Sequence, residues 1–205
     1  MVDRLDGHAD GFHIDVMDGH FVSELLFGPD LVRAVHGRAR TSLVDVHLLV
    51  ADADGWIEPF AAAGADLITI HAQSCRDPSS ALRSIEELGA RPALALALHE
   101  PVEVAGREML ELVDRVLLMG TALGISGADL DCATYSRIER LVAWRDATTR
   151  KPEIVIDGGI REHTVSLLAR AGADGVVPGS LIFGQPEWTD AIAHLHRLSP
   201  AAHDE

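Results

Sequence analysis

The chain has 205 residues, of which 47% are hydrophobic and 24% are charged, and its formal net charge at pH 7 is −15. This length and composition predict one globular domain over residues 1–205, with a sizeable core. The acidic charge argues against nucleic acid as the main partner, because a phosphate backbone attracts clustered Lys and Arg.

The cysteines and the hydropathy pattern limit where the protein works. Cys75 and Cys132 are the only cysteines, so there is no disulfide framework, and a reducing compartment is indicated. No apolar run approaches about 18 residues, and no basic and apolar leader is present, so neither a membrane span nor a secretory signal is expected. We therefore expect a cytoplasmic protein without a membrane partner.

Short apolar runs alternate with longer amphipathic runs along the chain. Strands are predicted over residues 11–16, 42–50, 66–71, 92–98, 115–119, 153–157 and 175–178. Helices are predicted over residues 30–36, 54–63, 78–88, 102–112, 135–149, 162–171 and 187–198. Because the strands are apolar on both faces and each is followed by a helix, we expect a parallel sheet covered by helices.

A weak internal repeat favours a particular α/β architecture. The phrase Ala-Gly-Ala-Asp occurs at residues 63–66 and again at 171–174, each time between a helix and the next strand. A glycine there suits a helix C-terminus that turns back quickly. No Gly-x-Gly-x-x-Gly follows the first strand, so a TIM (β/α)8 barrel is favoured over a dinucleotide-binding fold.

The first predicted strand carries the most informative residues. His13, Asp15 and Met17 share one of its faces, because alternate strand residues point the same way. An imidazole and a carboxylate there can hold a divalent cation, and the carboxylate can also move a proton, as in a metal-assisted isomerase or hydrolase. Two further apolar strands each carry one such residue. The strand predicted over 42–50 carries His47, and the strand predicted over 153–157 ends in Asp157. The four candidate ligands at these comparable strand ends are His13, Asp15, His47 and Asp157.

Several motifs together carry a family resemblance. Residues 13–22 read His-Ile-Asp-Val-Met-Asp-Gly-His-Phe-Val. They are followed by Phe-Gly-Pro at 27–29, Asp-Val-His-Leu at 45–48, Thr-Ile-His at 69–71, Leu-Leu-Met at 117–119, Asp-Gly-Gly-Ile at 157–160 and Gly-Ser-Leu-Ile-Phe-Gly at 179–184. In order and spacing, residues 5–185 resemble the ribulose-phosphate 3-epimerase family. The resemblance implies a TIM barrel that binds one divalent metal ion and interconverts D-ribulose 5-phosphate and D-xylulose 5-phosphate.

The resemblance also implies roles for the four candidate ligands. Inverting a carbon next to a ketone needs an acid/base group on each face of an enediolate, and the resemblance makes Asp15 the base and Asp157 the acid in one direction, with the roles exchanged in reverse. A metal held by His13, Asp15, His47 and Asp157 would stabilise the charge that develops on the sugar oxygens. This donor set suits Zn²⁺, and Fe²⁺, Mn²⁺ or Co²⁺ fit nearly as well.

Substrate contacts are implied by the same resemblance. Met17 and Met119 match positions whose thioethers lie against the enediolate, although a methionine on an apolar strand also fills core. The phosphate would be bound by backbone amides at glycines, because glycine lets N–H groups approach an anion closely. Without the resemblance, the same segments would be interpreted as ordinary turns. The expected substrate-binding residues are Met17, His71, Met119, Gly124, Ser126, Gly127, Gly158, Gly159, Gly179 and Ser180.

Two departures from the family pattern keep other hypotheses open. The loop at residues 120–128 lacks the family's Asn-Pro pair and glutamine, so another ketose phosphate, such as allulose 6-phosphate, is an alternative substrate. About a dozen residues precede His13, whereas a strand and a crossover helix need about 30. We therefore expect a barrel that lacks the first strand and most of the first helix, and whose uncovered edges favour a homo-oligomer. A weakly active or non-catalytic shortened relative is the third hypothesis.

Overall fold

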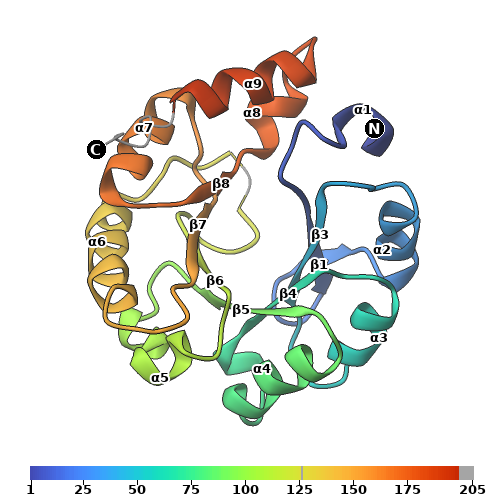
Figure 1. Cartoon of the computed structure of the whole chain (residues 1–205), viewed down its shortest axis with the longest axis vertical. Coiled ribbons are helices and arrows are strands. Elements are labelled where there is room, and N and C mark those ends of the chain that lie inside the picture. The colour runs from blue at the N-terminus through green and yellow to red at the C-terminus, as the bar shows by residue number, and fades with distance from the viewer. Residues whose placement is uncertain (126, 199–205) are drawn as a thin grey trace.

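An eight-stranded sheet forms the centre of the molecule, and helices surround it (Figure 1). The computed structural model describes residues 1–125 and 127–198. The strands are β1 (Gly11–Asp18), β2 (Leu25–Leu26), β3 (Leu43–Leu49), β4 (Leu67–His71), β5 (Arg91–Leu96), β6 (Arg115–Met119), β7 (Glu153–Asp157) and β8 (Gly175–Val177). Their order is β2-β1-β3-β4-β5-β6-β7-β8, and every neighbouring pair is parallel except β1 with β2.

Helices follow the parallel strands, as the alternating pattern predicts. The α-helices are α1 (Val2–Leu5), α2 (Pro29–His36), α3 (Ile57–Ala62), α4 (Pro78–Glu87), α5 (Arg107–Leu110), α6 (Ala133–Arg145), α7 (Glu162–Ala171), α8 (Gly179–Phe183) and α9 (Trp188–Leu198). The described residues also form two 3₁₀ turns, η1 (Ala72–Ser74) and η2 (Val102–Ala105). Within the described residues, no helix combines the length and the apolarity needed to cross a bilayer.

Most predicted elements are confirmed, and the differences have local causes. The strands predicted over 115–119 and 153–157 have those bounds. The single helix predicted over 102–112 is wrong, because Gly106 adopts an extended ψ of 168° and separates η2 from α5. The elements β2 and α8, with two and five residues, are too short to show a periodicity that would predict them.

Alternate side chains of the strands enter two different cores. On β3, Val44, Val46 and Leu48 pack against the helices in a large outer cluster. A smaller cluster fills the barrel interior and consists of Ala95, Leu117, Met119 and Val155. Since successive strand residues point to opposite faces, the remaining residues of β3, which include Asp45 and His47, point into the interior.

The sheet is open between β1 and β8, where the first strand is predicted to be missing. Among residues 1–125 and 127–198, β1 pairs only with β2 and β3, and β8 only with β7. Figure 1 shows α1 and β1 on one side of this opening and β8, α8 and α9 on the other. At the outside, Arg4 Nη2 lies 3.8 Å from Glu187 Oε2, and the Arg4 guanidinium lies 4.7 Å from the centre of the Trp188 ring. The predicted fold class, an α/β barrel, is confirmed, and the sheet opens where the first strand is predicted to be lacking.

Candidate metal centre

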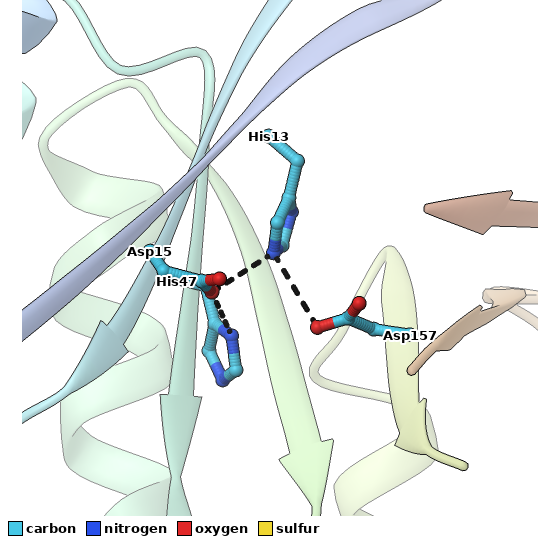
Figure 2. A group of neighbouring side chains, drawn as sticks. All are labelled: His13, Asp15, His47 and Asp157. Atoms are coloured by element: carbon cyan, nitrogen blue, oxygen red, sulfur yellow. Dashed lines mark hydrogen bonds and ion pairs between the residues drawn. The ribbon is translucent and has the colours of Figure 1, made fainter. Parts of the chain in front are cut away.

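The barrel interior brings the four predicted ligands together (Figure 2). Strand alternation places His13 and Asp15 on the interior face of β1. His47 lies opposite Asp15 in the register between β1 and β3. Asp157 is the last residue of β7 and approaches the two histidines from the other wall of the barrel (Figure 2).

The distances within this group match those between ligands of one cation. One ligand atom from each of the four side chains lies within 4.8 Å of all the others. Asp15 Oδ1 is 3.0 Å from His47 Nδ1 and 3.3 Å from His13 Nε2. His13 Nε2 is 4.0 Å from Asp157 Oδ2. Donors bound tetrahedrally at about 2 Å from Zn²⁺ stand roughly 3.3 Å apart, so the observed separations bracket the required one.

The hydrogen bonding of His13 Nε2 indicates whether these residues fit a metal ion. This nitrogen is buried and, in the described part of the chain, has no hydrogen-bond partner of acceptable geometry. Leaving such an atom unsatisfied costs about 1–3 kcal/mol, and a cation would remove that cost. The donor set of two imidazoles and two carboxylates suits a divalent transition metal. The residues therefore fit a divalent ion.

Each histidine of the group has a second partner behind it. His13 Nδ1 is 2.8 Å from Asp45 Oδ2, and His47 Nε2 is 3.0 Å from His71 Nε2. Burial, and after it the charge on His47, lowers the pKa of His71 to about 2. His71 is therefore neutral and can accept a hydrogen bond from His47. Partners of this kind hold ligand rings in one orientation.

The two carboxyl groups have opposite pKa shifts. Burial alone would raise the pKa of Asp15, but the adjacent His13 ring and the hydrogen bond with His47 outweigh burial and hold its pKa well below the ordinary value of 3.8. Burial raises the pKa of Asp157 above 3.8, with His13 opposing this rise and Asp15 reinforcing it. The environment therefore favours the ionised form of Asp15 and makes Asp157 the easier group to protonate.

The side chains predicted to contact substrate surround the same group. Met17 is half-buried on β1, two residues after Asp15. Met119 is buried in the interior cluster, and it is the register partner of Asp157. His71 is fully buried and lies behind His47. Their contacts with substrate stay a prediction.

The predicted phosphate-binding backbone lies at the ends of three strands. Gly158 and Gly159 follow β7 directly, with φ angles of 90° and 71°. The other residues of this prediction are Gly124 and Gly127 in the loop after β6, and Gly179 and Ser180 at the start of α8. Ser126 lies outside the described residues. Phosphate binding by these segments also stays a prediction.

Asp45 and Arg115 are two interior charges that sequence reasoning did not single out. Asp45 precedes His47 by two residues and shares its face of β3, so the spacing that identifies His47 could have identified Asp45 too. Arg115 is the first residue of β6 and reaches Asp45 across the barrel, with 2.9 Å between Nη1 and Oδ2. A contact between strands so far apart in the chain leaves no local signal.

Solved structures share the fold at low sequence identity. One crystal structure of KGPDC from Streptococcus mutans has a TM-score of 0.73 at 16% identity, over 94% of this chain and 86% of that one. The 3-hexulose-6-phosphate synthase from Salmonella typhimurium has a TM-score of 0.65 at 19% identity, over 94% of this chain and 89% of that one. These likenesses show the fold alone.

Sequence relatives show more than the fold. The ribulose-phosphate 3-epimerase of Bacillus subtilis (strain 168) is 36% identical over 191 residues, which cover 92% of this chain and 87% of the relative. The enzyme of that name from Escherichia coli (strain K12) is 32% identical over 201 residues, which cover 98% of this chain and 89% of the relative. A family model described as the ribulose-phosphate 3 epimerase family matches residues 2–183. The chain therefore belongs to the ribulose-phosphate 3-epimerase family, whose members are isomerases acting on carbohydrates.

Proposed function

We propose that this protein is a metal-dependent epimerase that inverts carbon 3 of a ketose phosphate and interconverts D-ribulose 5-phosphate and D-xylulose 5-phosphate. The observation that carries this proposal is the convergence of Asp15 and Asp157, from β1 and β7, with His13 and His47. Membership of the family supports the choice of substrate.

Asp15 and Asp157 would carry the proton transfers. Inversion removes a proton from one face of the carbon and returns a proton to the other face, through an enediolate. Asp15, which is held in its ionised form, fits the base. Asp157, whose pKa is raised by burial, fits the acid on the opposite face. In the reverse direction the two residues would exchange roles.

The four-residue group would hold the cation, for which Zn²⁺ is our first choice and Fe²⁺, Mn²⁺ or Co²⁺ the others. The ion would stabilise the negative charge that develops on the two sugar oxygens of the enediolate. Met17 and Met119 would lie against the planar enediolate, His71 would stand near the substrate, and their apolar neighbours would keep water out.

We assign the substrate's phosphate to backbone amides. Gly158 and Gly159 adopt a left-handed backbone, in which glycine lets N–H groups approach an anion closely. Gly179 and Ser180 begin α8 near the same end of the barrel. The loop after β6, with Gly124, Ser126 and Gly127, would cover the bound sugar.

Location and assembly complete the proposal. Cys75 and Cys132 are unpaired, which supports a reducing cytoplasm. The open sheet edges between β1 and β8 support a homo-oligomer of single-domain chains.

Metal removal and two aspartate variants test the proposal. We expect the zinc-loaded protein to convert D-ribulose 5-phosphate into D-xylulose 5-phosphate, and we expect a chelator to abolish this activity until zinc is returned. Asp15→Asn and Asp157→Asn should each lower kcat by about 10²–10⁴-fold, the usual contribution of an acid/base group. Asp190→Asn, the same change on the exposed side of α9, should retain the wild-type kcat.

A comparison of substrates separates the alternatives. A larger kcat/KM for allulose 6-phosphate than for D-ribulose 5-phosphate would replace the proposed substrate within the same chemistry. The altered loop at residues 120–128 is the feature that would explain such a result. Absence of turnover with either sugar, after loading with each of the four metals, would favour the weakly active or non-catalytic relative.

A further inference from the structure

Three charged side chains cross the barrel interior on the amino-terminal side of the candidate metal centre. Asp45 on β3, Arg115 on β6 and Glu153 on β7 form this group, which we name the cross-barrel row. Arg115 Nη1 donates to Asp45 Oδ2 at 2.9 Å, and Arg115 Nη2 and Nε donate to Glu153 Oε2 at 2.8 and 3.0 Å. At its other end, the row contacts His13, because Asp45 Oδ2 is 2.8 Å from His13 Nδ1.

The central contact of the row joins strands that are not neighbours. In the sheet, β4 and β5 stand between β3 and β6, so Arg115 reaches Asp45 through the interior. The side chains of Asp45 and Arg115 are only 6% and 13% exposed. Burying two charges costs desolvation free energy, which the ion pair offsets only if its geometry is good. An apolar pair at these positions would avoid that cost. The proposed proton transfers do not use the ion pair.

The row satisfies a requirement of the His13 ring. An imidazole has two nitrogens, and the hydrogen bond made by one decides which way the other presents its lone pair. Asp45 takes the hydrogen bond of Nδ1 and leaves Nε2 facing Asp15 and Asp157. Without the Asp45 carboxylate, nothing in the described contacts of Nδ1 would hold the ring in this orientation.

The open sheet makes this restraint more important. In the part of the chain that the structure describes, β1 has β3 on one side, and on its other side it pairs only through Met17 and Asp18 with β2. His13 therefore lies on a stretch of strand with one hydrogen-bonded neighbour. The row connects His13 to β6 and β7 through the interior, and β7 carries Asp157.

We propose that Asp45 and Arg115 are positioning residues of the metal centre. Asp45 orients His13 so that Nε2 faces the cation, and Arg115 holds Asp45 in place from the opposite wall of the barrel. This inference rests on the metal site given under the proposed function.

Zinc affinity of the full-length protein tests the inference without reference to activity. The metal-free protein would be titrated with Zn²⁺ in competition with a chromophoric chelator. Asp45→Leu removes the acceptor for Nδ1 and should weaken zinc binding by about 10–100-fold, the usual effect of losing a partner behind a metal ligand. Asp45→Asn keeps an acceptor oxygen and should recover part of this loss.

Arg115→Met tests the second half of the row. It should weaken zinc binding by about tenfold, because Asp45 loses the group that fixes it. Arg91→Met is the matched control. Arg91 Nη2 lies 3.4 Å from Glu153 Oε1 and Arg91 Nε lies 3.6 Å from Asp114 Oδ2, and within the described residues no ion pair joins Arg91 to Asp45. Arg91→Met should keep the wild-type zinc affinity. Absorption of bound Co²⁺ gives a second readout, and it should change in Arg115→Met and not in Arg91→Met.

The outcomes separate this inference from the metal site itself. Variants are compared only where circular dichroism shows the wild-type fold, and Arg115→Met carries the test if Asp45→Leu does not fold. Wild-type zinc affinity and an unchanged Co²⁺ spectrum in the folded variants would overturn the positioning role, while loss of binding in His13→Ala would leave the metal site standing. A wild-type protein that binds no zinc would remove both.

Discussion

At the scale of single residues, Asp6 fastens the N-terminal segment to the sheet. Its carboxylate accepts backbone hydrogen bonds from Arg40, Thr41 and Ser42 at 3.0, 3.1 and 2.9 Å. These bonds hold the pKa of Asp6 well below its ordinary value of 3.8, and the bond from the Ser42 backbone has the largest effect. The segment before β1 is thereby tied to the start of β3.

This pKa shift predicts a pH-dependent contribution to stability. Because the pKa of Asp6 is lower in the folded protein than in the unfolded chain, its stabilisation is fully present above about pH 5 and is lost as the pH falls below 3.8. We expect Asp6→Asn to lower the Tm at pH 7, and the gap to the wild-type Tm to narrow between pH 5 and pH 3. A gap that stays constant over this pH range would contradict the assignment, and Asp190→Asn should show no gap at either pH.

Single residues also show where sequence reasoning works and where it stops. The convergence of His13 and Asp15 follows from the two-residue period of a strand, and that of His47 and Asp157 from comparable positions at strand ends. The contact between His47 and His71 joins neighbouring strands, and it depends on side-chain orientation that no residue pattern specifies. The reach of Arg115 across the barrel interior depends on the curvature of the sheet, which is a property of the whole fold.

At the scale of elements, the turn after β7 is under the tightest steric constraint near the site. A Cβ atom on Gly159 would lie 2.5 Å from the backbone N and Cα of Leu130, and its φ is 71°. Gly89, after α4, has a similar φ of 86°, but a Cβ there would meet no described atom within 4 Å. The two glycines therefore separate the cost of the backbone conformation from the cost of crowding.

Alanine substitutions at these glycines should differ in stability. Gly89→Ala should cost about 1–2 kcal/mol for the left-handed backbone alone. Gly159→Ala should cost about a further 1–3 kcal/mol, because the backbone of Leu130 must shift. Urea unfolding of both variants measures the difference in the free energy of unfolding. Equal losses of unfolding free energy in the two variants would mean that the turn accommodates a Cβ atom on Gly159 without a shift of Leu130.

The elements themselves were predictable where the chain repeats a simple pattern. The strands β6 and β7 are apolar on both faces and bounded by polar residues, and their predicted bounds agree with the structure. The prediction failed between 102 and 112, because hydropathy alone does not reveal that Gly106 interrupts the helix. The pair of residues that forms β2 acquires its structure from pairing with Met17 and Asp18, which is a tertiary effect.

At the scale of the whole molecule, the opening between β1 and β8 is the dominant feature (Figure 1). Among the described residues, β8 and the part of β1 before Met17 have no strand partner on this side, and such edges favour pairing with another chain. Phe183 on α8, beside this opening, is 53% exposed and packs edge-on against Trp188 at 5.7 Å between ring centres. The opening therefore combines unpaired strand edges with an exposed aromatic ring.

Self-association through this opening can be measured by sedimentation velocity. We expect the protein to sediment as an oligomer at micromolar concentration, and Phe183→Glu to shift the distribution toward the monomer, because a buried charge opposes association. Leu88→Glu, a similar change at the 44% exposed residue that follows α4 on the far side of the ring, should leave the distribution unchanged. A wild-type protein that stays a soluble monomer would contradict this expectation.

The proposed two-aspartate epimerisation is tested most directly by hydrogen exchange with solvent. D-Ribulose 5-phosphate would be incubated in D₂O with the zinc-loaded protein, with Asp15→Asn and with Asp157→Asn, and deuterium would be located by NMR. We expect the wild-type protein to incorporate deuterium at carbon 3 and to form D-xylulose 5-phosphate, and we expect both variants to lose product formation. Product formed without deuterium, or formed equally by either variant, would contradict proton transfer by these two carboxylates.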